Sequence, residues 1–164
     1  MTAVSLKKIL TDANKNNYAV AGLVVLAWDD ALAFIKAADE TGVPIILQAG
    51  PSCRAHTPVP ILGKMFRYLA EQTKTHVCCH IDHGYTFREC AEGIDSGFTS
   101  VMFDGSKLSL KDNIKKTSKI VKRAHDAKVS VEGEIGFVGY ANGKSSEGTL
   151  PIEAVTFAKE SNVD

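Results

Sequence analysis

Several features that would assign this chain to a specialised class of protein are missing. Its 164 residues include 19 basic and 19 acidic side chains, so the formal net charge is zero. A chain without an excess of basic charge has no electrostatic attraction to nucleic acid or to an anionic membrane surface. We therefore expect neither nucleic acid nor a membrane among its partners.

Long apolar runs are missing as well. The longest, residues 19–28, has about ten residues, whereas a membrane-spanning helix needs about 20. The first residues lack the basic stretch followed by an apolar stretch that marks a signal peptide. The 4 cysteines have neither zinc-ribbon nor Cys-x-x-Cys spacing. Together these absences predict reduced, mostly buried thiols in a cytoplasmic protein.

Short apolar runs alternate with longer segments of helical periodicity along the whole chain. Strands are expected at residues 19–26, 43–49, 76–81, 99–103 and 129–134, helices at 2–16, 29–41, 61–73, 87–96, 110–127 and 151–160, and loops at 50–60 and 135–150. Continuous apolar strands separated by helices indicate a parallel sheet that is covered on both faces. No linker interrupts the pattern, so we expect residues 1–164 to form a single domain.

Two architectures fit this pattern, an open doubly wound sheet and a (β/α)₈ barrel. The sequence has no Gly-x-Gly-x-x-Gly after the first expected strand and no P-loop, which disfavours the open sheet. Polar residues instead follow or end several strands, namely Asp82, His83, Asp104, Glu132 and Glu134. A barrel gathers its chemistry at one rim, from many strands at once. Five βα units in 164 residues also suit an open sheet, but the polar residues at several strand ends favour the barrel.

The sharpest motif is His80-Ile81-Asp82-His83-Gly84, which closes an expected strand. Strand alternation places His80 and Asp82 on one face and His83 at the turn. A neutral imidazole is a good zinc ligand, and a neighbouring carboxylate that is not itself a ligand can move a proton on a bound substrate. The same residues also suit a helix cap beside packed or solvated histidines, so the motif alone leaves both interpretations open.

Two further groups of acids are expected at the same rim. Glu132 and Glu134 share one face of an otherwise apolar strand, where burial without a cation is costly. This favours a metal ion, a basic partner or protonation, unless both groups stand at a solvated strand end. Asp104 follows the expected strand 99–103. Three interpretations are open for it: a metal ligand, a group that orients a neighbour, or a cap of a turn or helix.

Taken together, these motifs resemble the class II, metal-dependent ketose-bisphosphate aldolases. The segments that carry the resemblance are residues 4–10, 17–20, 44–48, 80–84, 97–102 and 132–136. They are collinear over nearly the whole chain. The most specific feature is the order of the His-x-Asp-His-Gly segment and the Glu-x-Glu segment that follows it.

The resemblance implies an α/β fold, a (β/α)₈ TIM barrel that is incomplete because this chain holds about five of the eight βα units. It also implies a homodimer or homotetramer. Its substrate is a phosphorylated sugar, a ketose 1,6-bisphosphate of the fructose or tagatose type, cleaved reversibly to dihydroxyacetone phosphate and glyceraldehyde 3-phosphate. It implies that Asp82 is the acid/base on the hydroxyl of the cleaved carbon. His83 then resembles one of three histidines that bind a catalytic Zn²⁺ or another divalent metal. Asp104 and Glu134 match positions that hold a second or alternative metal position in some members.

The remaining candidate site residues rest on weaker grounds. Glu132 lies in the same motif as Glu134, and His80 lies two residues before Asp82. Both are expected to contact the metal ligands or the acid/base group rather than the metal or the substrate. The candidates for contact with the substrate are Gln48, Gly50, Arg54 and Ser106. For Arg54, a position in a solvated loop is the competing interpretation.

The chain departs from the family pattern in several places. It ends where a sixth strand is expected, and the family's other two zinc histidines and its glycine-rich phosphate loops lie beyond that point. We therefore expect an N-terminal part of an aldolase that is inactive alone. Residues 23–26 are apolar where many members have an asparagine, Gly50 replaces a frequent serine, and residues 137–142 lack the usual closing glutamate. The alternative is a non-catalytic aldolase-like barrel that binds a phosphosugar or a protein partner.

Overall fold

The computed structural model describes residues 1–136 and 148–164. Within them, five parallel strands form one sheet in the order β1-β2-β3-β4-β5. The strands are β1 (Ala21–Val24), β2 (Ile45–Ala49), β3 (Val77–Gly84), β4 (Ser100–Asp104) and β5 (Ser130–Glu134). Because each new strand joins the same edge, the strand order never reverses, as in a barrel and unlike an open doubly wound sheet. This confirms the predicted incomplete barrel.

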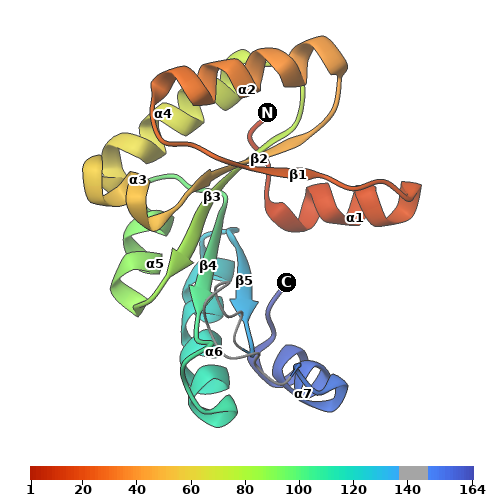
Figure 1. The fold of residues 1–164 in the computed structure, drawn as a ribbon, viewed down its shortest axis with the longest axis vertical. Helices are drawn as coiled ribbons and strands as arrows, with labels where there is room; N and C mark the ends of the chain where they lie inside the picture. Colours follow the sequence, from red (N-terminus) through yellow and green to blue (C-terminus); the bar gives the residue numbers. More distant parts are fainter. Residues whose placement is uncertain (137–147) are drawn as a thin grey trace.

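Helices connect the strands and surround the sheet (Figure 1). They are α1 (Leu6–Asn16), α2 (Trp28–Thr41), α3 (Pro51–His56), α4 (Val59–Gln72), α5 (Phe87–Asp95), α6 (Leu110–Asp126) and α7 (Pro151–Ser161). Helix α2 packs on β2, α4 and α5 pack on β3, and α6 packs on β5, whereas α1 contacts both β3 and β5. Among the described residues, no helix is both long and apolar enough to cross a membrane.

The core has two layers because side chains alternate between the two faces of each strand. Leu47 and Cys79 belong to the large layer between the sheet and the outer helices. Ile46 and Cys78 face the other way and pack against Ile9 of α1. The adjacent cysteines therefore point to opposite faces, as strand alternation predicts, and all 4 cysteines are free and buried.

The first strand differs from the prediction. The sequence predicts a strand buried on both faces over residues 19–26, but β1 covers only Ala21–Val24 and most of its side chains are exposed. The reason is its place in the sheet, because β1 is an edge strand with β2 as its neighbour and has no described strand on the other side. Apolar composition alone does not distinguish an edge strand from a central one.

Three other boundaries are corrected. The helix predicted at 2–16 begins only at Leu6, where the side chain of Ser5 accepts a hydrogen bond from the Lys8 amide. The loop predicted at 50–60 contains α3, which starts with Pro51 at a position that needs no amide donor. The strand predicted to end at residue 81 continues to Gly84. The predicted loop 135–150, with the family difference at 137–142, lies mostly outside the described residues.

Candidate metal and catalytic site

The end of β3 is irregular where the His-Ile-Asp-His-Gly motif lies. Ile81 pairs with Val101 of β4 but Gly84 pairs with Phe103, so β3 holds one extra residue in a bulge. Within it, His83 has a φ of 52°, in the left-handed region that residues other than glycine rarely adopt. Bulges of this kind redirect side chains at the rims of barrels. Here the bulge directs His83 towards the ends of β4 and β5.

Three side chains from three strands meet at this rim. The Nδ1 atom of His83 lies 3.0 Å from Oδ2 of Asp104 and 3.4 Å from Oε2 of Glu134. Asp104 and Glu134 end β4 and β5 and are register partners in the sheet. One ligand atom from each of the three residues lies within 4.8 Å of the others. The structure therefore brings together the three residues that the sequence proposes as metal ligands.

The charges of this cluster are coupled. Partial burial lowers the pKa of His83, but its hydrogen bond to Asp104 and the charges of Asp82 and Glu134 outweigh burial, so the net shift is upward. Burial alone would raise the pKa of Asp104, but hydrogen bonds from Ser106 and His83 bring it below its usual value. Burial and the neighbouring Asp104 charge raise the pKa of Glu134. The site thus concentrates negative charge around one imidazole.

One oxygen of this cluster has an ion-pair neighbour, His83, but no hydrogen-bond donor among the described residues. Oε2 of Glu134 is buried and accepts no hydrogen bond from the described residues. A buried carboxylate oxygen that accepts no hydrogen bond is costly, and a cation is one of the few groups that offset the cost. An imidazole nitrogen with carboxylate oxygens is a donor set for zinc, iron or manganese ions. The residues present therefore fit the divalent metal ion that the family resemblance implies.

Asp82 shares a cavity with the cluster. The cavity has a volume of about 850 Å³ and is lined by Asp82, His83, Asp104, Glu132 and Glu134 among others. Oδ1 of Asp82 lies 4.0 Å from Nε2 of His83, on the side of the ring away from Asp104. Its side chain is 16% exposed. A carboxylate beside, but not inside, the donor cluster can exchange a proton with a molecule held there.

Behind the cavity, His80 forms a buried polar contact. Its side chain is 1% exposed, and Nδ1 lies 2.9 Å from the hydroxyl oxygen of Ser100. Nε2 has no hydrogen-bond partner among the described residues and lies 3.5 Å from Oε2 of Glu132. Burial lowers the pKa of His80 to about 4, so the ring is neutral at pH 7. Desolvation and the Asp82 charge raise the pKa of Glu132, although its side chain is 45% exposed.

The four residues proposed to contact substrate have different surroundings. Ser106 lines the cavity, and its hydroxyl donates to Oδ1 of Asp104 at 2.6 Å. Gly50 precedes α3, where a Cβ atom would touch Oδ2 of Asp82 at 3.4 Å. Gln48 lies in β2 with its amide group over Gly22. The guanidinium of Arg54 donates to backbone carbonyls, including that of His83 at 2.9 Å. Within the described part of the chain, only Ser106 of these four lines the cavity.

Asn113 is a site neighbour that sequence reasoning missed. It lies on α6, its side chain is almost fully buried, and its amide donates to the carbonyl of Glu134 at 2.7 Å. Its oxygen accepts from the hydroxyl of Thr117 at 3.0 Å. Asn113 thereby anchors the end of β5. The signal was available, because a polar residue stands in the apolar stripe of an amphipathic helix.

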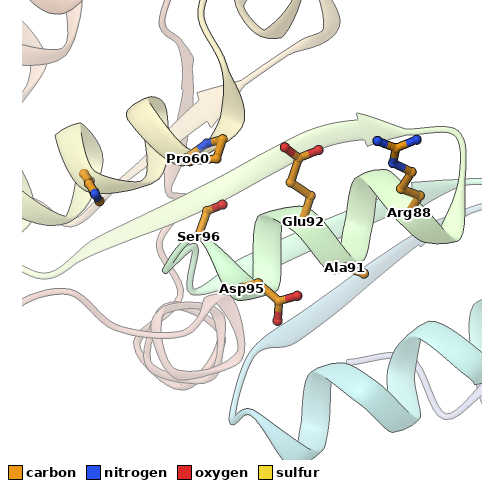
Figure 2. Close-up of a pocket in the computed structure, with 7 residues that line it drawn as sticks. Pro60, Arg88, Ala91, Glu92, Asp95 and Ser96 are labelled. Atoms are coloured by element: carbon orange, nitrogen blue, oxygen red, sulfur yellow. The ribbon is translucent and has the colours of Figure 1, made fainter.

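A second hollow, of about 530 Å³, lies between α4 and α5. Figure 2 shows Arg88, Glu92 and Ser96 along the α5 side of this hollow, with Pro60 across from them. Its charges are mixed in sign, and its described lining contains none of the proposed site residues. The rim cavity therefore remains the candidate site.

Known sequences match this chain along most of its length. Residues 4–164 match the family described as fructose-bisphosphate aldolase class-II. The fructose-bisphosphate aldolase of Staphylococcus epidermidis is 39% identical over 142 residues, covering 85% of this chain and 50% of that protein. The Helicobacter pylori fructose-bisphosphate aldolase is 34% identical over 164 residues, covering 96% and 53%. The chain thus spans about half the length of these curated relatives.

Solved structures agree with the sequence match. The YdjI aldolase from Escherichia coli K12 superposes with a TM-score of 0.87 at 25% identity, covering 99% of this chain and 59% of that one. The Campylobacter jejuni fructose-bisphosphate aldolase gives 0.79 at 21% identity, covering 98% and 54%, a likeness of fold alone. With the rim geometry and the family match in agreement, the chain belongs to the class-II fructose-bisphosphate aldolase family.

Proposed function

We propose that this chain is part of a metal-dependent aldolase. The reaction is the reversible cleavage of a ketose 1,6-bisphosphate, of the fructose or tagatose type, to dihydroxyacetone phosphate and glyceraldehyde 3-phosphate. The observation that carries the proposal is the meeting of Asp82 with the cluster of His83, Asp104 and Glu134 in one cavity. The relatives in Staphylococcus epidermidis and Helicobacter pylori are fructose-bisphosphate aldolases, which supports the substrate class.

The proposed metal ligands are His83, Asp104 and Glu134, and the proposed metal is Zn²⁺ or another divalent ion. When bound, such an ion supplies a Lewis acid that stabilises the negative charge developing on a ketone during carbon–carbon cleavage. Ser106 orients Asp104 by donating hydrogen bonds to Oδ1 from its amide and its hydroxyl. This leaves Oδ2 of Asp104 directed at His83.

Asp82 is the proposed acid/base. In the cleavage direction its carboxylate takes the proton from the hydroxyl of the carbon at which the sugar chain breaks. In the condensation direction it returns that proton. Its place at the cavity wall, 4.0 Å from the His83 ring, lets it reach a substrate without occupying a ligand position. We propose that His80, on the same strand as Asp82, and Glu132, on β5, hold the surroundings of Asp82 in place.

The three described donors leave coordination positions open. By resemblance, two further histidines belong to the part of the relatives that this chain does not span, so we propose that the 164-residue chain alone is inactive. The proposed assembly of the whole protein is a homodimer or homotetramer. A cytoplasmic location is proposed on the strength of four buried, free cysteines.

The test combines metal analysis of the intact protein with a coupled aldol-cleavage assay, run with and without a chelator. We expect bound metal, cleavage of the ketose bisphosphate, and loss of both on chelation with recovery when Zn²⁺ is returned. The His83→Ala variant should lose metal first. Cleavage that survives chelation would refute the proposal, whereas metal binding without any cleavage would favour the non-catalytic phosphosugar binder.

A further inference from the structure

Arg54 occupies an unexpected place at the rim. It lies on the short helix α3 directly after β2, with its side chain half-buried. Its Nη1 donates to the carbonyls of Ala49 and Asp82, and its Nη2 donates to the carbonyl of His83 at 2.9 Å. One guanidinium therefore connects the last residue of β2 to the two residues in the bulge of β3.

These carbonyls need such a donor. A bulge removes residues from the regular ladder of strand hydrogen bonds, and a backbone carbonyl left without a donor is destabilising when it is shielded from water. The left-handed backbone of His83 adds strain at the same point. Arginine suits the task, because its guanidinium stays charged and presents five donors in a rigid plane.

The same contacts argue against a phosphate-binding role for Arg54. Within the described part of the chain, Arg54 is not among the residues that line the rim cavity. Its Nη atoms are directed at backbone oxygens of β2 and β3. Three of the five guanidinium N–H donors thus bind backbone oxygens, which favours a structural role over contact with a substrate phosphate.

We propose that Arg54 is a positioning residue that holds Asp82 and His83 in their working geometry by tying the end of β2 to the bulge of β3. The proposal rests on the proposed function for its effect on turnover, but not for its effect on the bulge. Loss of the guanidinium lets the bulge relax. The His83 imidazole and the Asp82 carboxylate then lose their fixed positions together.

The experiment compares Arg54→Ala and Arg54→Lys with wild type in the intact protein. The matched control is Arg88→Ala, an exposed arginine on α5. Three quantities are measured: Zn²⁺ affinity by competition with a chelator, hydrogen exchange of the amides of residues 82–84 in metal-free protein, and kcat and KM for the ketose bisphosphate. Circular dichroism identifies any variant that fails to fold.

We expect Arg54→Ala to bind Zn²⁺ about 10- to 100-fold more weakly, the usual effect of removing a group that orients a metal ligand. Exchange of the amides at 82–84 accelerates, kcat falls, and KM stays within about threefold, because the substrate contacts themselves are unchanged. Guanidinium ion at a sub-denaturing concentration partly restores Zn²⁺ affinity in Arg54→Ala. Arg54→Lys recovers only part of the affinity, since an ammonium group cannot reproduce the planar fork.

The opposite pattern overturns the proposal. If KM rises strongly in Arg54→Ala while Zn²⁺ affinity and amide exchange equal those of Arg88→Ala, Arg54 contacts a substrate phosphate instead. If Arg54→Ala does not fold, Arg54→Lys and its amide exchange decide the matter. If the intact protein cleaves no ketose bisphosphate, the proposed function fails, but Zn²⁺ affinity and amide exchange still test the role of Arg54.

Discussion

Polar side chains at the two ends of the parallel strands differ in how completely their hydrogen bonds are made within the chain. At the amino-terminal ends, Asp39 accepts hydrogen bonds from the hydroxyl of Thr73 and the amide of Lys74. Asp164 accepts from the amide of Val131 and contacts His125 at 2.9 Å. At the carboxyl ends, Glu134 and its neighbours surround one imidazole, and a buried oxygen of Glu134 accepts no hydrogen bond from the described residues.

The difference separates stability from chemistry. Polar groups whose hydrogen bonds are all made within the chain hold the elements in register and offer nothing to a ligand. Polar groups left short of partners are unfavourable by themselves and gain from a cation or a substrate. This matches the general division of a barrel, in which the carboxyl-end rim carries the active site and the opposite rim carries stability. The predictions below test that division.

The largest expected effect is at the functional end. Asp82→Asn removes the proton acceptor but keeps the size of the side chain. Cleavage should slow by about 10²- to 10⁴-fold, the usual contribution of a positioned proton-transfer group, while bound metal is retained. The measurement is the coupled assay with metal analysis of the same sample. Asp95→Asn, in an exposed ion pair with Arg123, serves as the control, and an unchanged rate in Asp82→Asn would break the assignment.

The second effect lies in the interior between the two ends. The pKa of His80 in the folded protein is about 4, against about 6.5 in an unfolded chain. Well above pH 6.5, His80 is neutral in both the folded and the unfolded chain, so its ionisation does not change stability. Between pH 6.5 and 4 only the unfolded chain gains the proton, so the free energy of unfolding should fall by roughly 3 kcal/mol.

Urea unfolding at a series of pH values measures this loss. The variant His80→Gln lacks the imidazole at position 80 and should flatten the decline. The matched control is His56→Gln, which replaces an exposed histidine of α3. A decline of equal size in His80→Gln would place its origin elsewhere in the chain.

The third effect is at the stability end. The carboxylate of Asp164 is 7% exposed and receives hydrogen bonds from Lys7 and Val131 as well as contacting His125. Asp164→Asn should lower the free energy of unfolding by about 1–3 kcal/mol, because these bonds involve a charged group. Metal affinity should not change. Denaturant unfolding at pH 7 tests this, and a weaker metal site with normal stability would contradict it.

The contribution of Asp164 to stability should also depend on pH, because its pKa in the folded protein is lowered. Burial by itself would raise the pKa of Asp164, but the Val131 amide, His125 and Lys7 bring it below its usual value. The stabilisation is therefore present above the unfolded value of about 3.9 and is lost as pH falls through the folded pKa.

The smallest expected effect is on the stability of the metal-free protein, and the same variant also tests metal binding. Glu134→Gln removes one charge from a cluster of like charges, so the metal-free protein should gain about 0.5–1 kcal/mol of stability. The same change should weaken Zn²⁺ binding. Unfolding experiments without metal and chelator competition with metal measure the two consequences. A loss of stability in metal-free Glu134→Gln would show that the cluster is satisfied as it stands.

Much of this arrangement follows from local sequence pattern. The alternation of apolar strands and amphipathic helices predicts the parallel sheet, and the motifs at 80–84 and 132–136 place Asp82, His83 and Glu134 at strand ends. The prediction fails where a neighbour in space decides the outcome. Residues 19–26 are as apolar as a central strand, yet β1 is an exposed edge. Arg54 looks like a loop cation, yet it donates to the backbone of β3.

The sequence by itself determined the order of strands and helices, the family, and the set of side chains available at the rim, because periodicity and motif depend on residues close together in the chain. Only the tertiary structure decided which of these side chains meet. The bulge that turns His83 towards Asp104, and the contact of Arg54 with carbonyls 28 and 29 residues away, join separate strands. Such contacts depend on how the strands are placed beside one another, which no local pattern specifies.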